Sequence, residues 1–209
     1  MDTESLDTPT NDIETPDVPT PSSVRNKPLA MGVDDGYARV KLRGEGPDGR
    51  VIESAIASQA KAGQHALSDM NGGGQVAAYT TQEGESFTVT EKLAGEDTKF
   101  DGFHVSPLNR VLVQHALIQA GYGGRDVSLF CGVPVADYFK NGQRNDGLIR
   151  EKAENLKGGV TPADGSEPAP IVDVQVGAQA VAAFFEDRFD DQGRPRPGRD
   201  PQADFAVVD

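Results

Sequence analysis

Short apolar runs separated by turn residues dominate the chain after its first thirty positions. They predict strands at Met31 to Val33, Ala38 to Leu42 and Arg50 to Ala57, with Pro47-Asp48-Gly49 turning the chain between the last two. Strands this close together in sequence favour a meander of antiparallel pairs. The glycine-rich stretch from Gln59 to Gly74 is predicted to be a loop, or an irregular helix followed by a loop.

A hairpin and a capped helix follow. Gln75 to Thr81 and Ser86 to Thr90 are predicted to pair about the turn Glu83-Gly84. Ser106-Pro107 is typical of a helix start, since serine can cap free N–H groups and proline is tolerated at the first helical position. Apolar residues then recur at helical spacing as far as Gly121, where the helix is predicted to end.

Strands and helices alternate in the last third of the chain. Nearly continuous apolar runs predict strands buried on both faces at Asp126 to Val133 and at Ile171 to Val176. Helices are predicted from Asn145 or Asp146 to Leu156 and from Gly177 to about Phe189, before a final strand at Asp204 to Val208. This order predicts an α/β fold with a mixed sheet, parallel in its later strands. Ligands of such folds bind at the carboxyl ends of the strands.

The N-terminal segment, residues 1–29, differs from the rest of the chain. It holds three Thr-Pro pairs, carries far more acids than bases, and has only scattered apolar residues. Such a segment buries too little apolar surface to offset its ordering entropy, so we predict a disordered acidic tail. Residues 30–209 are predicted to form the folded unit.

Composition narrows the classes of function. The 209 residues are 36% hydrophobic and carry a net charge of −13, which fits a globular protein and argues against direct binding to nucleic acid. No apolar run is as long as a membrane-spanning helix, and the N-terminus lacks the zones of a secretory signal. We therefore expect a cytoplasmic protein with no membrane partner.

The cysteine and histidine residues indicate packing rather than chemistry. Cys131 lies in an apolar run, which favours a buried thiol, and His115 lies on the apolar stripe of the predicted helix, which favours a core histidine. The three histidines share no ligand spacing with one another or with the cysteine, so a zinc site is not expected.

The stretch MGVDDGYARVKL contains the main candidate for chemistry. A glycine turn at Gly36 lets backbone N–H groups approach phosphate oxygens, Lys41 on the return strand supplies a positive charge, and Asp34 would face the accompanying Mg²⁺. The alternative is an ordinary hairpin, because Asp-Gly between two apolar runs is the commonest hairpin signal.

Three segments together resemble a known family. They are DDGYARVKLRGEGPDGRV, SPLNRVLVQHALIQAGYGGRDVSLFCGVPVADYF and VDVQVGAQAVAAFF. Their order and spacing are similar to the N-terminal half of the ParM/StbA actin-like plasmid-segregation ATPases, over about Met31 to Asp209. The resemblance implies domain I of an actin-like, ribonuclease H-like fold, with a mixed, partly parallel sheet flanked by helices.

The resemblance also implies a role for individual residues. Those implied to bind the nucleotide are Asp35, Gly36, Tyr37, Ala38 and Lys41. Those implied to act in catalysis are Asp34, Gln179 and Asp209, with Gln179 orienting the attacking water and both aspartates holding Mg²⁺ through water. The expected cofactors are ATP or GTP with Mg²⁺.

The implied function is nucleotide-dependent polymerisation into filaments that move plasmid DNA through an adaptor protein. Asp209 resembles the start of the family's second phosphate loop, and the sequence stops there, so we expect weak nucleotide binding and little hydrolysis from this chain alone. Two alternatives remain open. One is a truncated, non-catalytic domain that binds other proteins, and the other is a different ATPase of the actin, Hsp70 and sugar-kinase superfamily.

Overall fold

The computed structural model describes residues 27–46, 48–65, 77–90, 95, 97–179, 181–190 and 192–199. The predicted final strand, Asp209 and almost all of the predicted tail lie outside the described residues.

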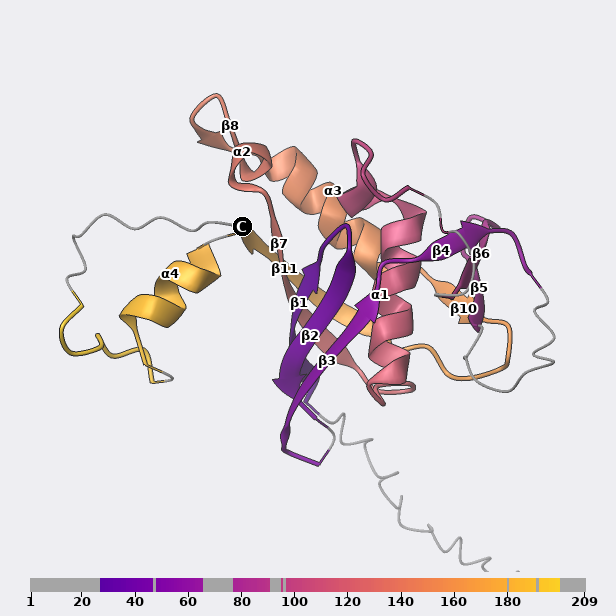
Figure 1. Ribbon diagram of the computed structural model, residues 1–209, viewed down its shortest axis with the longest axis horizontal. Helices are drawn as coiled ribbons and strands as arrows, with labels where there is room; N and C mark the ends of the chain where they lie inside the picture. The colour runs from indigo at the N-terminus through magenta and orange to yellow at the C-terminus, as the bar shows by residue number, and fades with distance from the viewer. Residues whose placement is uncertain are drawn as a thin grey trace, which may run out of the picture.

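A five-stranded mixed sheet forms the centre of the molecule (Figure 1), in the spatial order β11-β7-β1-β2-β3. Its strands are β1 (Leu29–Asp35), β2 (Arg39–Glu45), β3 (Val51–Ala57), β7 (Val127–Val133) and β11 (Ile171–Ala178). The first three pair antiparallel, and β7 lies parallel to both β1 and β11. The predicted meander, and the prediction of a mixed sheet that is parallel in its later strands, are confirmed.

A second sheet of four short strands lies apart from the first, in the order β10-β5-β6-β4. Its strands are β4 (Ala60–Ala62), β5 (Ala77–Thr81), β6 (Ser86–Val89) and β10 (Val160–Pro162). The hairpin of β5 and β6 was predicted, with Gly84 in the left-handed region at φ 89°. The loop prediction for Gln59 to Gly74 is wrong at β4, because three residues are too few to show strand periodicity.

The helices begin where the capping residues indicate. In α1 (Pro107–Gln119) the Ser106 hydroxyl accepts a hydrogen bond from the Asn109 N–H at 3.2 Å, and in α3 (Asp146–Lys157) the Asn145 side chain accepts one from Leu148. The last described helix, α4 (Val181–Arg188), starts later than predicted because β11 continues to Ala178. Short unpredicted elements are η1 (Phe103–Val105), α2 (Val135–Tyr138), β8 (Phe139–Lys140) and β9 (Gln143–Arg144).

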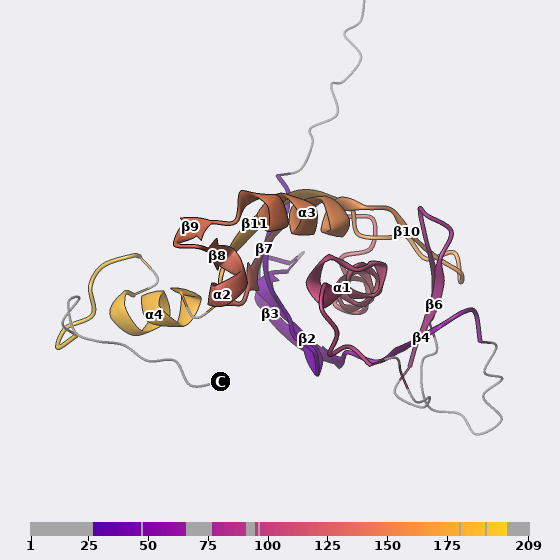
Figure 2. The same cartoon turned by 90° about the horizontal axis from the view of Figure 1, so that it is seen from above.

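Helix α1 lies between the two sheets (Figure 2) and is the centre of the core. Val111, Leu112 and Leu117 on this helix are fully buried, and they form one cluster with inward-facing residues of both sheets. Helix α3 packs beside α1 and against β11. One helix therefore attaches the smaller sheet to the larger one.

The outer face of the large sheet is more open than the sequence predicted. Burial alternates along β7, and Phe130 at its centre is 51% exposed. The Phe130 ring lies over Gly177 of β11, where a Cβ atom would stand 3.0 Å from the ring. The prediction that β7 and β11 are buried on both faces is therefore wrong, because the helices α1 and α3 cover only one face of these strands.

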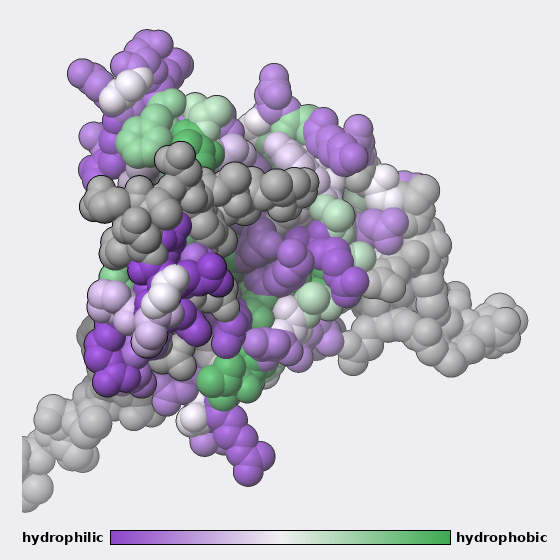
Figure 3. Space-filling model, turned by 60° about the vertical axis from the view of Figure 1, so that its left-hand side comes forward, coloured by the Kyte–Doolittle hydropathy of each residue, from purple (hydrophilic) through white to green (hydrophobic). Residues whose placement is uncertain are grey.

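Apolar side chains also reach the surface over α2 and β8 (Figure 3), where Val135 and Phe139 are each 47% exposed. In the described part of the chain, no helix is both long enough and apolar enough to cross a membrane.

Candidate functional site

Three parallel strands of the large sheet end at one edge. They are β1, β7 and β11, which end at Asp35, Val133 and Ala178. Because neighbouring strands are about 4.8 Å apart, side chains at the ends of β1 and β11 lie about 10 Å apart across the sheet. Asp34 on β1 and Gln179 just after β11 are thus at the same edge, which is where ligands of such folds bind.

The turn from β1 to β2 has an uneven hydrogen-bond pattern. Its three carbonyl groups are occupied: the Ser58 hydroxyl donates to Gly36 at 2.7 Å, the Thr98 hydroxyl to Tyr37 at 2.6 Å, and the Ser58 N–H to Ala38 at 2.9 Å. Within the described residues, the N–H groups of Tyr37 and Ala38 donate to no protein acceptor, whereas the Gly36 N–H faces the Arg39 carbonyl across the turn. A turn with satisfied carbonyls and free N–H groups is suited to binding an anion.

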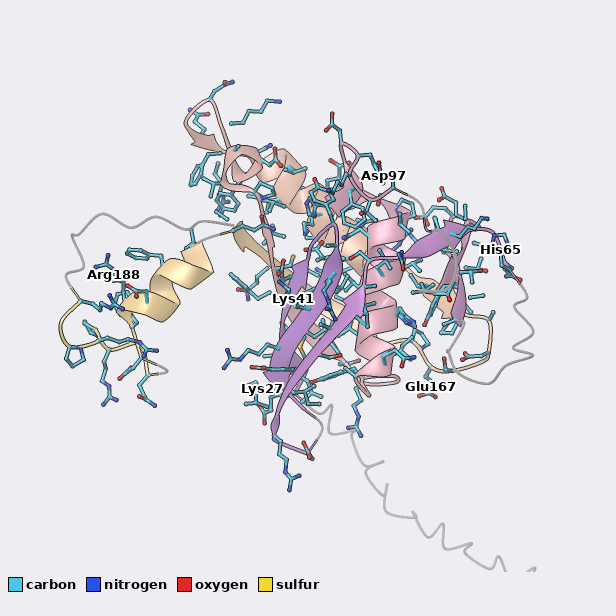
Figure 4. All side chains as sticks on the ribbon, in the orientation of Figure 1. Lys27, Lys41, His65, Asp97, Glu167 and Arg188 are labelled. Carbon is cyan, nitrogen blue, oxygen red and sulfur yellow. The ribbon has the colours of Figure 1, made fainter. Side chains whose placement is uncertain are left out.

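Asp34 and Lys41 face each other across the hairpin. They are directly paired in the register of β1 and β2, and the Lys41 ammonium lies 2.9 Å from the Asp34 carboxylate. Both side chains are more than half exposed, at 61% for Lys41 and 52% for Asp34. Figure 4 shows Lys41 on the sheet below the turn. An exposed pair of this kind is weak, so either partner can exchange it for a ligand.

The structure places Asp35 differently from its neighbour. Successive residues of a strand point to opposite faces, and the Asp35 side chain points into the core, where the residue is 0% exposed. Its carboxylate contacts Lys152 and Asn109 rather than solvent. The side chain of Asp35 therefore faces away from the surface that Asp34 and Lys41 share.

Gln179 is held at the end of β11 by its backbone. Its N–H donates to the Val133 carbonyl at 2.8 Å, which extends the pairing of β11 and β7 by one residue. Its side chain is half-buried and lies over Gly132, where a Cβ atom would come within 2.9 Å of the Gln179 Cγ atom. The absence of a side chain at Gly132 leaves the room in which Gln179 lies.

A cavity of about 680 Å³ opens beside the turn. It is lined by the turn itself, by residues 57–59, and by the segment that carries Asp97 and Lys99. Figure 4 shows Asp97 on this segment, near the top of the hairpin. In the described part of the chain, the cationic side chains of Arg39 and Lys99 on its walls form no ion pair. The volume is in the usual range for a small-molecule site.

These residues fit a phosphate group better than a bare metal ion. Among the described residues there is no cluster of three His, Cys, Asp or Glu side chains that could hold a metal. Asp34 is an exposed carboxylate beside the turn, which suits a Mg²⁺ ion held mainly by phosphates and water. Asp209, the second predicted carboxylate, lies outside the described residues.

Cys131 and His115 are buried, as predicted. Burial raises the pKa of the Cys131 thiol to about 12, so the thiol stays protonated at neutral pH. Burial lowers the pKa of His115 to about 4, and its Nδ1 atom lies 2.7 Å from the Tyr79 hydroxyl. Both groups belong to the core.

Several residues around the hairpin were missed by sequence reasoning. Ser58 and Thr98 contact the turn from 22 and 61 residues away, so no local pattern marks them. Lys152 had a usable signal, because it stands four residues from both Leu148 and Leu156 on one face of its helix. A lysine on an apolar stripe indicates a buried partner.

Solved structures show a similar fold at low sequence identity. The archaeal actin homologue Ta0583 is similar with a TM-score of 0.54 and 20% identity, over 75% of this chain and 47% of that one. The apo pSK41 ParM protein has a TM-score of 0.53 and 12% identity, over 78% and 53%. The Alp12 filament structure has a TM-score of 0.52 and 16% identity, over 77% and 49%.

These likenesses establish an actin-like fold, and the chain spans about half the length of the structures it matches. No curated protein matches the chain. A family model described as plasmid segregation protein ParM, N-terminal, matches residues 29–189, which is well over half of the 209 residues. The chain therefore belongs to the family of ParM N-terminal domains.

Proposed function

We propose that this chain is the part of an actin-like plasmid-segregation ATPase that binds the phosphates of ATP or GTP through its β1–β2 hairpin. The observation that carries the proposal is the turn at Gly36 to Ala38, whose three carbonyl groups are occupied while the N–H groups of Tyr37 and Ala38 are free. Membership of the ParM family and the position of the turn at the carboxyl edge of the sheet support the same assignment.

Each residue of the hairpin has a distinct part in this proposal. The N–H groups of Tyr37 and Ala38 donate to phosphate oxygens, Gly36 gives the turn its close approach, and Lys41 leaves Asp34 to neutralise phosphate charge. Asp34 then orients water bound to Mg²⁺, which neutralises the remaining phosphate charge when it is bound. Gln179 orients the attacking water by hydrogen bonds, since a neutral amide cannot act as a strong base.

The wider function rests on the family. We propose that the whole protein polymerises in a nucleotide-dependent way in the cytoplasm, and that an adaptor protein connects the filament to plasmid DNA. The net charge of −13 supports an indirect link, because direct contact with DNA phosphates requires clustered positive charge. Asp209 completes the proposed set as a second carboxylate for Mg²⁺ and catalysis.

Nucleotide titration of the 209-residue chain tests the phosphate site. Binding is followed by ³¹P NMR and thermal shift at millimolar ATP or GTP, with and without Mg²⁺. Lys41→Ala should weaken binding about tenfold, the value of one charge-assisted contact. In the Asp34→Ala variant, adding Mg²⁺ should no longer strengthen nucleotide binding. The variant should still bind nucleotide, with the weaker affinity that is measured in the absence of Mg²⁺.

Arg43→Ala is the matched control, because Arg43 is an exposed cation on the same face of β2, two residues farther from the turn. It should bind nucleotide like the wild type. If the wild-type chain binds neither nucleotide, or if Lys41→Ala and Arg43→Ala have the same effect, the proposed site is wrong. A domain that binds only other proteins would then be the better assignment.

A further inference from the structure

A buried polar cluster lies directly beneath the proposed phosphate hairpin. The Lys152 ammonium on α3 donates to Oδ2 of Asp35 at 2.6 Å, and the Asn109 amide on α1 donates to the same oxygen at 2.8 Å. Nδ1 of His104 on η1 lies 3.6 Å from that oxygen. Asp35, Lys152 and Asn109 are all 0% exposed. Three separate elements thus meet at the last residue of β1.

The cluster is not arranged for stability alone. Removing both ions of a pair from water is costly, and apolar side chains of similar volume usually serve a core as well or better. In the described part of the chain, Oδ1 of Asp35 and Oδ1 of Asn109 are also buried without a hydrogen-bond partner. Burial by itself raises the pKa of Asp35, but His104 and Lys152 outweigh it and hold the pKa below its usual value. The buried carboxylate of Asp35 therefore stays negatively charged, and this charged group is called the anchor below.

The position of this anchor connects it to the turn. Asp35 precedes Gly36 directly, and the Tyr37 ring lies 5.4 Å from the Phe103 ring and 5.2 Å from the His104 ring. Asp35, which leads into the turn, and Tyr37, its second residue, thus both lie against the η1 segment. In Figure 1 the turn lies close to the start of α1, which carries Asn109.

We infer that Asp35 is a positioning residue, which acts through Lys152 and Asn109 to hold the hairpin turn in the conformation that presents its free N–H groups. Its carboxylate touches no phosphate itself. This inference rests on the proposed function, because it assigns Asp35 a part in the same phosphate site. In this inference Asp34 faces the bound ligand, whereas Asp35 contacts the protein interior.

The test replaces the ion pair by apolar groups, as Asp35→Leu together with Lys152→Met. This double variant leaves no unpaired charge in the core, but the buried Asn109 amide loses its acceptor, so we expect a folded protein with a lower thermal midpoint than the wild type. Amide hydrogen exchange of Ser58, whose buried N–H donates to the Ala38 carbonyl of the turn, should rise by about tenfold or more in the nucleotide-free protein. ATP binding should weaken by about the same factor.

Gln114→Leu is the matched control. Gln114 is another buried polar residue of α1, but its side chain bonds the backbone of Ala169, away from the hairpin. Its loss should leave exchange of the Ser58 amide unchanged. If the double variant also leaves this amide exchange at the turn unchanged, or if Gln114→Leu raises that exchange equally, the inference is overturned.

Asn109→Ala decides the matter should the double variant fail to fold, since it removes one contact to Asp35 and leaves the ion pair in place. It should raise exchange of the Ser58 amide, and wild-type exchange there would overturn the inference. These measurements need no nucleotide, so they separate this inference from the proposed function. A wild-type chain that fails to bind ATP contradicts the function, whereas an unmoved turn contradicts the role of Asp35.

Discussion

Lowering the pH should destabilise this protein through one buried side chain, His115. The imidazole is 8% exposed, and its Nδ1 atom lies 2.7 Å from the hydroxyl of Tyr79, which is 2% exposed. Burial raises the pKa of Tyr79, so its hydroxyl stays protonated and is able to donate to an unprotonated Nδ1 of the neutral ring. The pair joins α1 to β5, and therefore joins the two sheets through the helix between them.

The magnitude follows from the two pKa values of His115. Burial lowers the pKa to about 4 in the folded protein, compared with 6.5 for an ordinary histidine. The unfolded chain therefore binds more protons between these values, and stability is lost as the pH falls through that window. From about pH 8 to about pH 5.5 the free energy of unfolding should fall by about 1.4 kcal/mol because of this residue.

Urea denaturation at several pH values, for the wild type and for His115→Gln, measures this contribution. Glutamine keeps an acceptor for Tyr79 but does not titrate, and the remaining ionisable groups are common to both proteins. The stability difference between the two should shrink by about 1.4 kcal/mol towards pH 5.5. Tyr79→Phe should keep the wild-type pH dependence at a lower stability, because the ring stays buried. A stability difference between wild type and His115→Gln that does not change with pH would refute the reasoning.

Three further predictions concern packing. Gly44→Ala places a Cβ atom 2.4 Å from the Ala30 carbonyl oxygen, so the strands must separate, and we expect a loss of at least about 2 kcal/mol in urea denaturation. Ser106→Ala removes the cap on the Asn109 N–H and should cost about 1 kcal/mol, measured in the same way, whereas Ser106→Thr should retain most of it. Cys131 should not react with a thiol reagent at about pH 8 in the native protein, since burial raises its pKa to about 12, and it should react fully in urea. Rapid labelling of the native protein would contradict the burial of this thiol.

Local signals account for much of what could be predicted. The hairpin at Gly36, the serine cap of α1 and the alternation of strands with helices are properties of neighbouring residues, so each was visible in the sequence. The sequence could also have predicted that the side chains of Asp34 and Asp35 lie on opposite faces of the strand. Asp35 shares the parity of Met31 and Val33, and those apolar residues mark the buried face of the strand.

By itself, the sequence determined the hairpin, the capped helices and the parallel strands whose ends form the candidate site, because periodicity and turn chemistry act over a few residues. Only the tertiary structure decided what surrounds the hairpin. Ser58, Thr98 and Lys152 reach it from 22, 61 and 117 residues away, counted from the residues they contact. The second sheet is completed by β4 and β10, two three-residue strands that are too short to carry a pattern. Contacts between such distant residues depend on how the elements pack, which no local pattern encodes.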